Sequence, residues 1–310
     1  MAALTASDFK NLVRETFSEW SRDKASRLAA ALSYYTIFSV APLLIIAIGV
    51  AGLVFGREAA THQLVTEAEG LLGRQGAEAI QSLLQHANRT GAGVIATVIG
   101  IATLLIGASG AFAQLQDSLN TIWEVKPRTG RGIKGMLRDR FLSFSMVLVI
   151  GFLLLVSLVV SAALAAVGKY LGGVLPIPSS LIQAINFAIS FAVTTLLFAL
   201  IFKVLPDVRI RWRDVWIGAA VTALLFSVGR FAIGLYLGRS SVSSAYGAAG
   251  SLVVLLLWIY YSAQILFLGA EFTQVYASRF GKGMVPKPNA EPINPPSPDS
   301  GNPSGAAGRP

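Results

Sequence analysis

Long apolar segments alternate with short charged segments along this chain of 310 residues, and the pattern predicts a helical membrane protein. The apolar windows, which are free of charge except for Arg230 in the fifth, cover about residues 28–56, 94–115, 141–168, 181–202, 215–238 and 248–270. Each window approaches or exceeds the roughly 20 residues that a helix needs to cross a bilayer. We therefore expect an all-α, polytopic bundle of six transmembrane helices within residues 28–276.

The first window is unusually polar for a membrane span. Its polar side chains and its one proline are Ser33, Tyr34, Tyr35, Thr36, Ser39 and Pro42. A proline inside a helix removes one backbone hydrogen bond and crowds the preceding turn. Such a break persists in a membrane only where protein or water satisfies the freed backbone groups. We expect a broken first span that depends on neighbouring helices.

Three segments flank or connect these windows. Residues 1–27 carry apolar side chains at helical spacing with basic side chains between them, which predicts an amphipathic helix at the cytoplasmic membrane surface or packed on the bundle. Residues 57–93 contain two apolar repeats at helical spacing, which predict a helical cap on the extracytoplasmic face. Residues 277–310 become rich in Pro, Gly, Asn and Ser after Val285, so we expect a disordered cytoplasmic tail.

The distribution of Lys and Arg predicts the orientation in the membrane. Of the 25 Lys and Arg residues, 19 lie in the N-terminal segment, the tail and the loops at 117–140 and 203–214, whereas the alternate loops hold 5. Cytoplasmic loops are enriched in these residues, so both termini should be cytoplasmic. The net charge of +9 is explained by this topology and by contact with anionic lipid headgroups, and nucleic acid is not an expected partner.

The composition offers little for metal, cofactor or covalent chemistry. Only 13% of the residues are charged and the mean hydropathy is +0.63, values typical of membrane proteins. The chain has no cysteine, and His62 and His86 lack neighbours at ligand spacing. The GRGIKG sequence at 130–135 matches the letters of a dinucleotide-binding motif but lacks the preceding strand, so a flexible basic loop is the simpler interpretation. We expect no metal, no cofactor and no enzymatic activity.

Arg230 is the one charge deep within a predicted span. A charge at that depth costs roughly 2.5–3.5 kcal/mol, so the side chain should face the bundle interior or water. The fourth span places a polar stripe of Asn186, Ser190 and Thr194 near the same depth. One hypothesis is a site for an anionic group bound by the guanidinium. The alternative is a structural arginine that bonds helix carbonyls or extends toward the outer headgroups.

Polar side chains also gather where the second and sixth spans end on the cytoplasmic side. The second span contributes Gln114, Asp117 and Asn120, and the sixth contributes Gln264 and Glu271. If these two faces meet, they would form a cytoplasmic gate or a cation-coupling site. The alternative is that these carboxylates lie at the membrane interface and balance basic neighbours.

Four ordered blocks of the chain are similar to a known family. They are Asp23 with LAAALSYYTIFSVAPLL at 28–44, LQDSLNTIW at 115–123, YGAAGSL at 246–252, and LLWIYY at 256–261 with GAEF at 269–272. These blocks, within about residues 10–280, resemble the YihY/virulence factor BrkB family. The resemblance implies a six-helix bacterial inner-membrane protein with cytoplasmic termini, transporter-like and linked to serum resistance and envelope maintenance. Members were once labelled ribonuclease BN, an activity for which this chain lacks the metal-ligating histidines.

The leading hypothesis is a transporter or permease that moves a small or amphiphilic solute, anionic if Arg230 contacts it. The polar half of the first span, Arg230 and the stripe on the fourth span would line the path. The chain shows no ATP-binding motif, so transport would be driven by a gradient or by a partner. The alternative is a non-transporting scaffold for envelope assembly or lipid handling. A homo-oligomer and an envelope partner are both left open.

Overall fold

The computed structural model describes residues 5–62, 64–66, 69, 77–78, 80–82, 84, 110–128, 179–239, 250–281 and 283–293. Its elements are α1 (Ala6–Arg22), α2 (Ala25–Phe55), β1 (Val125–Pro127), α6 (Ser179–Val204), β2 (Val208–Arg209), α7 (Trp212–Arg239), α9 (Gly250–Phe280), β3 (Val285–Pro286) and β4 (Ala290–Pro292). A further helical segment covers residues 110–122. The predicted span at 141–168, most of that at 94–115, and the tail beyond 293 lie outside the described residues.

The described helices confirm a helical membrane bundle. Three of them contain segments long and apolar enough to cross a membrane, namely Phe187–Val204, Trp212–Ile233 and Leu252–Phe280. Large apolar side chains on these helices point away from the protein, for example Phe187 at 60% exposure and Phe231 at 75%. Exposed apolar side chains on long apolar helices are suited to contact with lipid. Helix α2, with 31 residues, is also long enough to span.

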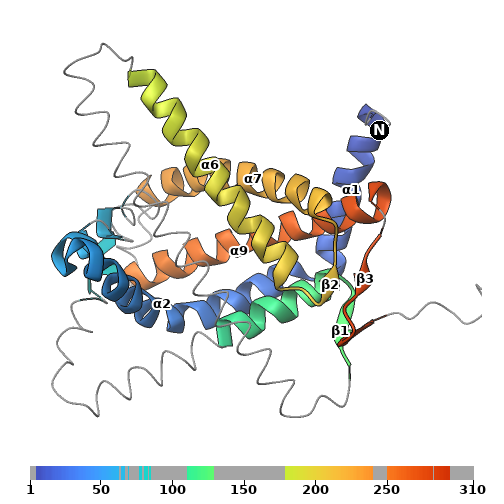
Figure 1. Ribbon diagram of the computed structural model, residues 1–310, viewed down its shortest axis with the longest axis horizontal. Helices are drawn as coiled ribbons and strands as arrows, with labels where there is room; N and C mark the ends of the chain where they lie inside the picture. Colours follow the sequence, from blue (N-terminus) through green and yellow to red (C-terminus); the bar gives the residue numbers. More distant parts are fainter. Residues whose placement is uncertain are drawn as a thin grey trace, which may run out of the picture.

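Helix α9 lies at the centre of the arrangement and packs against α1, α2 and α7, while α6 packs on α7 (Figure 1). The main core between them consists of fully buried apolar side chains, including Ala29, Phe202, Ala219 and Phe267. Small residues among the large ones let the helix backbones approach closely. The interior of the described bundle is therefore held by tight side-chain packing.

Helices α7 and α9 contact each other through two matched glycine–threonine pairs. A Cβ added to Gly218 would lie 2.7 Å from Cβ of Thr273, and one added to Gly269 would lie 2.8 Å from Cβ of Thr222. Each threonine hydroxyl donates to the carbonyl of the glycine four residues before it in its own helix. The polar atoms are thus satisfied within each helix, and the two glycines set the distance between the helices.

Helix α1 begins with a capping box, in which Thr5 and Asp8 satisfy each other's backbone N–H groups. It ends at Asp23, and Lys24 adopts a left-handed conformation before α2 begins. Leu12 on α1 is buried in a cluster with three α9 residues, Phe272, Val275 and Tyr276. The predicted N-terminal amphipathic helix is therefore present, and one of its faces packs on the bundle.

The predicted break at Pro42 is wrong, because α2 is one continuous helix through this position. In the preceding turns, Thr36 Oγ1 donates to the carbonyl of Leu32 at 2.7 Å and Ser39 Oγ donates to that of Thr36 at 2.9 Å. Such serine and threonine bonds, together with neighbouring helices, allow a proline within a transmembrane helix. A proline in this environment does not by itself interrupt the span.

Two small antiparallel sheets close one end of the bundle (Figure 1). Strand β1 pairs with β4, and β2, between α6 and α7, pairs with β3. The predicted disorder is therefore wrong for residues 283–293, which form ordered strands after α9. Backbone pairing and the burial of Ala290 explain this order, and the prolines Pro286 and Pro292 are compatible with two-stranded edges.

The opposite end of the bundle carries the predicted cap. All the residues that the structure describes between 57 and 84 are helical. Ala60, Ala77, Ile80 and Leu84 are buried there in one cluster with residues of α2 and α9, namely Ile48, Leu255 and Ile259. Short amphipathic helices thus cover the end of the bundle that lies away from the strands.

Candidate functional site

The end of the bundle closed by the strands contains several buried polar side chains. One group is centred on Asp207, which lies between α6 and β2. Asn120 donates to Asp207 Oδ2 at 3.2 Å, Asn289 donates to Oδ1 at 3.1 Å, and the backbone N–H of Asp207 donates to Asn120 Oδ1 at 2.8 Å. The N–H of Lys287 donates to the carbonyl of Asp207 at 2.8 Å. This group joins three distant segments, and its role is structural.

Glu271 on α9 has a different environment. The residue is fully buried, at 0% exposure, and neither carboxylate oxygen has a hydrogen-bond partner among the described residues. The side-chain oxygen of Gln264, two turns earlier, is also buried without a partner there. Burying an ionised carboxylate without a partner is very costly, so such a group holds a proton or a cation.

Three carboxylates near this position pair with one guanidinium. Arg22 Nη2 lies 2.8 Å from Glu124 Oε1, Arg22 Nε lies 3.8 Å from Asp23 Oδ1, and Arg22 also pairs with Glu19. All four of these charges lie close enough to act electrostatically on Glu271. We call Glu19, Asp23, Glu124 and Glu271 the carboxylate cluster. It joins the end of α1, the turn after residue 122, and α9.

The charge state of this cluster is sensitive to pH. Burial raises the pKa of Asp23 to about 6; Arg22 opposes the rise, whereas the negative charges of Glu19 and Glu124 add to it. Burial is also the main cause that raises the pKa of Glu19. Asp23 is the residue that ends α1, and its backbone N–H donates to the carbonyls of Glu19 and Ser21. The turn between α1 and α2 therefore holds a carboxyl group whose pKa is about 6.

The predicted gate residues are only partly brought together. Glu271 is fully buried on α9, whereas Gln264 is half-buried and only its side-chain oxygen is enclosed. Asn120 is held by Asp207, and Gln114 donates to Ser118 Oγ at 3.2 Å. Asp117 is exposed, and it is not among the charges that act on Glu271.

The acidic neighbours of Glu271 are Asp23, Glu19 and Glu124, which the sequence did not single out as site residues. Asp23 is the first residue of the first block that resembles the family, and it lies shortly before the first predicted span. That position was the one signal that could have identified it. Glu19 and Glu124 carried no such signal.

The polar residues of α2 divide between two environments. Ser33 and Ser39 are buried, and each hydroxyl donates to a carbonyl of its own helix, those of Ala30 and Thr36. Tyr34 and Tyr35 are exposed, at 60% and 43%. The side chain of Pro42 lies outside the described residues. The hydroxyls of these serines are therefore satisfied within the helix itself.

Arg230 is exposed on α7 and does not enter the described core. Its neighbour Phe231 is 75% exposed and Val228 is 63% exposed, so the guanidinium stands in an apolar outer surface. On α6, Thr194 and Ser190 are half-buried, and the Thr194 hydroxyl donates to the Ser190 carbonyl at 2.8 Å. The side chain of Asn186 lies outside the described residues. This arrangement favours the interpretation in which Arg230 extends along the membrane toward headgroups.

Long apolar helices with lipid-suited surfaces, around a tightly packed core, define a multi-pass helical membrane protein. The model of the virulence factor BrkB family matches residues 16–294, and the chain belongs to this family. The match includes strands β3 and β4, so the ordered part of the tail lies within the family region.

Two similar proteins are both named as membrane proteins. A UPF0761 membrane protein of Alkalilimnicola ehrlichii is 29% identical over 275 residues, which make up 88% of this chain and 59% of the relative. One of Halorhodospira halophila is 30% identical over 257 residues, 82% of this chain and 54% of the relative. The chain thus spans somewhat over half the length of these relatives. No solved structure matches it significantly.

Proposed function

We propose that this protein is an inner-membrane transporter or permease for a small or amphiphilic solute, with Glu271 at its cytoplasmic gate. The observation that carries the proposal is the complete burial, within a membrane-spanning helix, of a carboxylate that has no hydrogen-bond partner in the described part of the chain. Ionisable side chains within such helices are expensive to maintain and mark ion or substrate pathways. No enzymatic activity is part of the proposal.

The proposed orientation places the strand end of the bundle in the cytoplasm. This end carries α1 and the β strands, and the described segments there include most of the Lys and Arg of the N-terminal, 117–140 and 203–214 regions. Exposed Trp212 and Trp216 lie in the first turns of α7 at the same end, with Lys203 Nζ 5.5 Å from the Trp212 ring centre. Basic residues beside aromatic ones are typical of the cytoplasmic interface.

The proposed solute class depends on a contact with Arg230 at the membrane-facing surface of α7, not inside the bundle. An exposed guanidinium within an apolar outer surface suits an amphiphilic anion that reaches the protein from the membrane. The apolar part of such a solute would contact side chains such as Val228 and Phe231. An anionic amphiphile is therefore the first class to test.

Uptake into proteoliposomes tests the proposed transport. We expect the wild-type protein to move at least one amphiphilic anion under an imposed pH or cation gradient, and Glu271→Gln to reduce this gradient-driven uptake to background. The matched control is Glu291→Gln, which removes an exposed carboxylate that pairs with Lys126 at the same end. Wild-type uptake by Glu271→Gln, in protein inserted at wild-type level, would contradict the assigned gate.

A scaffold without transport activity is the second candidate function. The observation in its favour is that the hydroxyls of Ser33, Ser39 and Thr194 bond to their own helices and leave no free polar lining there. If no solute class is taken up by folded, reconstituted protein, the scaffold becomes the better proposal. A second copy of the chain or an envelope protein would then be the partner to seek.

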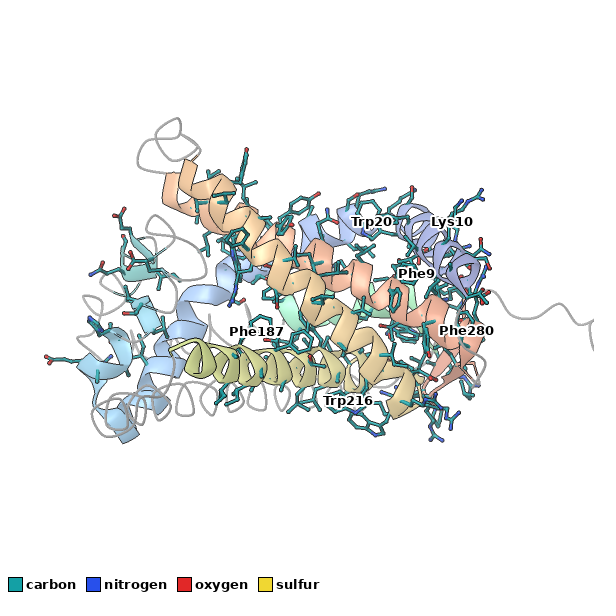
Figure 2. All side chains as sticks on the ribbon, turned by 90° about the horizontal axis from the view of Figure 1, so that it is seen from above. Phe9, Lys10, Trp20, Phe187, Trp216 and Phe280 are labelled. Atoms are coloured by element: carbon teal, nitrogen blue, oxygen red, sulfur yellow. The ribbon has the colours of Figure 1, made fainter. Side chains whose placement is uncertain are left out.

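Anionic lipid headgroups are the proposed partners of α1. This helix runs across the long axis of the bundle (Figure 1), and Figure 2 shows its Phe9 and Lys10 at the same end as Phe280. Phe9 and Phe17 are 59% and 55% exposed, and Lys10 and Arg14 are also exposed. Exposed aromatic residues beside basic ones allow a helix to lie in the headgroup layer.

Because the chain has no cysteine, single-cysteine labelling can test this lipid contact directly. A fluorophore on Phe9→Cys should be quenched by brominated lipid in anionic vesicles and shielded from aqueous iodide. The control is Asn11→Cys, which is exposed two residues away and therefore on the opposite side of the helix. Equal quenching of both labels by iodide would show that α1 does not enter the headgroup layer.

A further inference from the structure

We propose that the carboxylate cluster is a proton-binding site, in which Asp23 transfers protons between water and the buried Glu271. The inference deepens the proposed function, on which its role in transport rests, because it makes the proton the coupling ion. The proposal assigns the proton as the ligand of residues that come from three separate segments. Of these residues, only Glu271 was predicted from the sequence to belong to a gate.

The side chains of the carboxylate cluster become less exposed to solvent from the surface toward the interior. The side chains of Arg22 and Glu124 are 57% and 43% exposed, that of Asp23 is 13% exposed, and Glu271 is fully buried. Asp23 therefore lies between a hydrated ion pair and an isolated carboxylate. Asp23 follows the end of α1, which packs on α9, and its charge lies close enough to act on Glu271.

The charge balance of the cluster favours a bound proton. Three carboxylates pair with Arg22, and Glu271 has no partner among the described residues, so full ionisation would leave three negative charges in excess of the one guanidinium. Like charges at close range disfavour simultaneous ionisation. The groups that face Glu271 are Asp23, Glu19 and Arg22 on or just after α1, and Glu124 after the 110–122 segment. A single proton on Asp23 or Glu271 removes one of the excess charges.

The transfer step is a simple exchange. The carboxylate of Asp23 accepts a proton from a hydronium ion, which becomes water, and Asp23 becomes a neutral carboxylic acid. It then gives this proton to the ionised Glu271, so that Asp23 returns to the carboxylate and Glu271 becomes neutral. Arg22 keeps its charge throughout and continues to pair with Glu19 and Glu124.

The pH dependence of stability supplies the first test. The pKa of Asp23 is raised from 3.8 to about 6 in the folded protein, so the folded state binds more protons than the unfolded state in this interval. The stabilisation is complete below 3.8 and is lost as pH rises through about 6. We expect the apparent melting temperature of wild-type protein to fall between pH 5 and pH 7.5, and this fall to be smaller in Asp23→Asn.

Infrared spectroscopy of the carboxyl groups supplies the second test and requires no transport. We expect wild-type protein at pH 7 to show the band of a buried carboxylic acid that Glu271→Gln removes and Glu291→Gln retains. Asp23→Asn should retain this band but slow its exchange in heavy water. Glu271→Gln should fold, because glutamine fills the same volume without a charge.

The possible outcomes distinguish a failure of the proton-binding site from a failure of the proposed transport. If the band and the Asp23 effects are present but no solute is taken up, the proton site stands and transport fails. If uptake is observed while Glu271→Gln leaves the infrared spectrum unchanged, the proton site is wrong. A wild-type exchange rate in Asp23→Asn would overturn the assignment of Asp23 as the residue that transfers the proton.

Discussion

Replacing Gly269 with alanine is expected to force α9 away from α7 and to lower the stability of the bundle. The added Cβ would lie 2.6 Å from Cγ2 and 2.8 Å from Cβ of Thr222, distances that real side chains do not tolerate. Because the obstacle lies close to the backbone of α7, a change of rotamer cannot relieve it. Overpacking of this kind costs roughly 1–3 kcal/mol. Thermal unfolding in detergent would measure the loss.

A second substitution tests whether the loss of stability comes from the clash with Thr222 and not from the alanine itself. The double variant Gly269→Ala, Thr222→Gly removes the side chain that opposes the new Cβ. It should recover part of the lost stability, but the new glycine inside α7 costs about 1 kcal/mol. The control Ala232→Val enlarges a side chain on the exposed surface of α7 and should be nearly neutral. Wild-type stability of Gly269→Ala would show that α7 and α9 do not approach as closely as described.

Replacing Asp207 with alanine is the second change expected to have a large effect. The side chain accepts hydrogen bonds from both Asn120 and Asn289, and the substitution leaves these amides without their acceptor. Asp207 and Asn120 are buried at 4% and 3% exposure, so water cannot fully replace the carboxylate. Lost bonds to a buried charge predict a destabilisation of about 3 kcal/mol.

Limited proteolysis and thermal unfolding would report this change together. The strands β3 and β4 should become cleavable in Asp207→Ala at conditions where the wild type resists. The control Glu291→Ala breaks an exposed ion pair with Lys126 in the same sheets and should cost less than about 1 kcal/mol. Equal protection of residues 283–293 from proteolysis in Asp207→Ala and wild type would show that Asp207 does not hold these strands in place.

The sequence pattern could predict the helices because a helix that crosses lipid requires a long run of apolar residues, which is visible in the sequence. The windows at 181–202 and 215–238 correspond to α6 and α7 within a few residues at each end. The window at 248–270 ended too early, because α9 continues to Phe280. The pattern stopped at the charge of Glu271, whereas the helix accommodates that residue by burying it within the protein. A rule based on charge cannot distinguish a residue that ends a span from one that the bundle encloses.

The candidate site was less predictable, because its members come from separate segments. Spacing along one helix linked Gln264 with Glu271; Glu271 is fully buried, and the side-chain oxygen of Gln264 is enclosed. Nothing in the spacing could show that Asp23 and Glu124 approach the same carboxylate. Their approach depends on the turn at Lys24 and on the packing of α1 across α9.

Composition also misjudged two local features. The proline-rich segment after Val285 suggested disorder, but pairing with β1 and β2 depends on backbone groups that composition does not describe. Pro42 suggested a break, but the helix continues through it. In both cases the tertiary environment satisfies groups that the isolated segment would leave free.

The most direct test of the central claim is uptake of an anionic amphiphile into proteoliposomes under an imposed pH gradient, with simultaneous measurement of internal pH. The account predicts that solute and protons move together in wild-type protein and in Glu291→Gln. It also predicts that Glu271→Gln abolishes both movements while remaining folded. Solute uptake without proton movement in the wild type, or proton-linked uptake that survives Glu271→Gln, would contradict the claim that Glu271 is the coupling site.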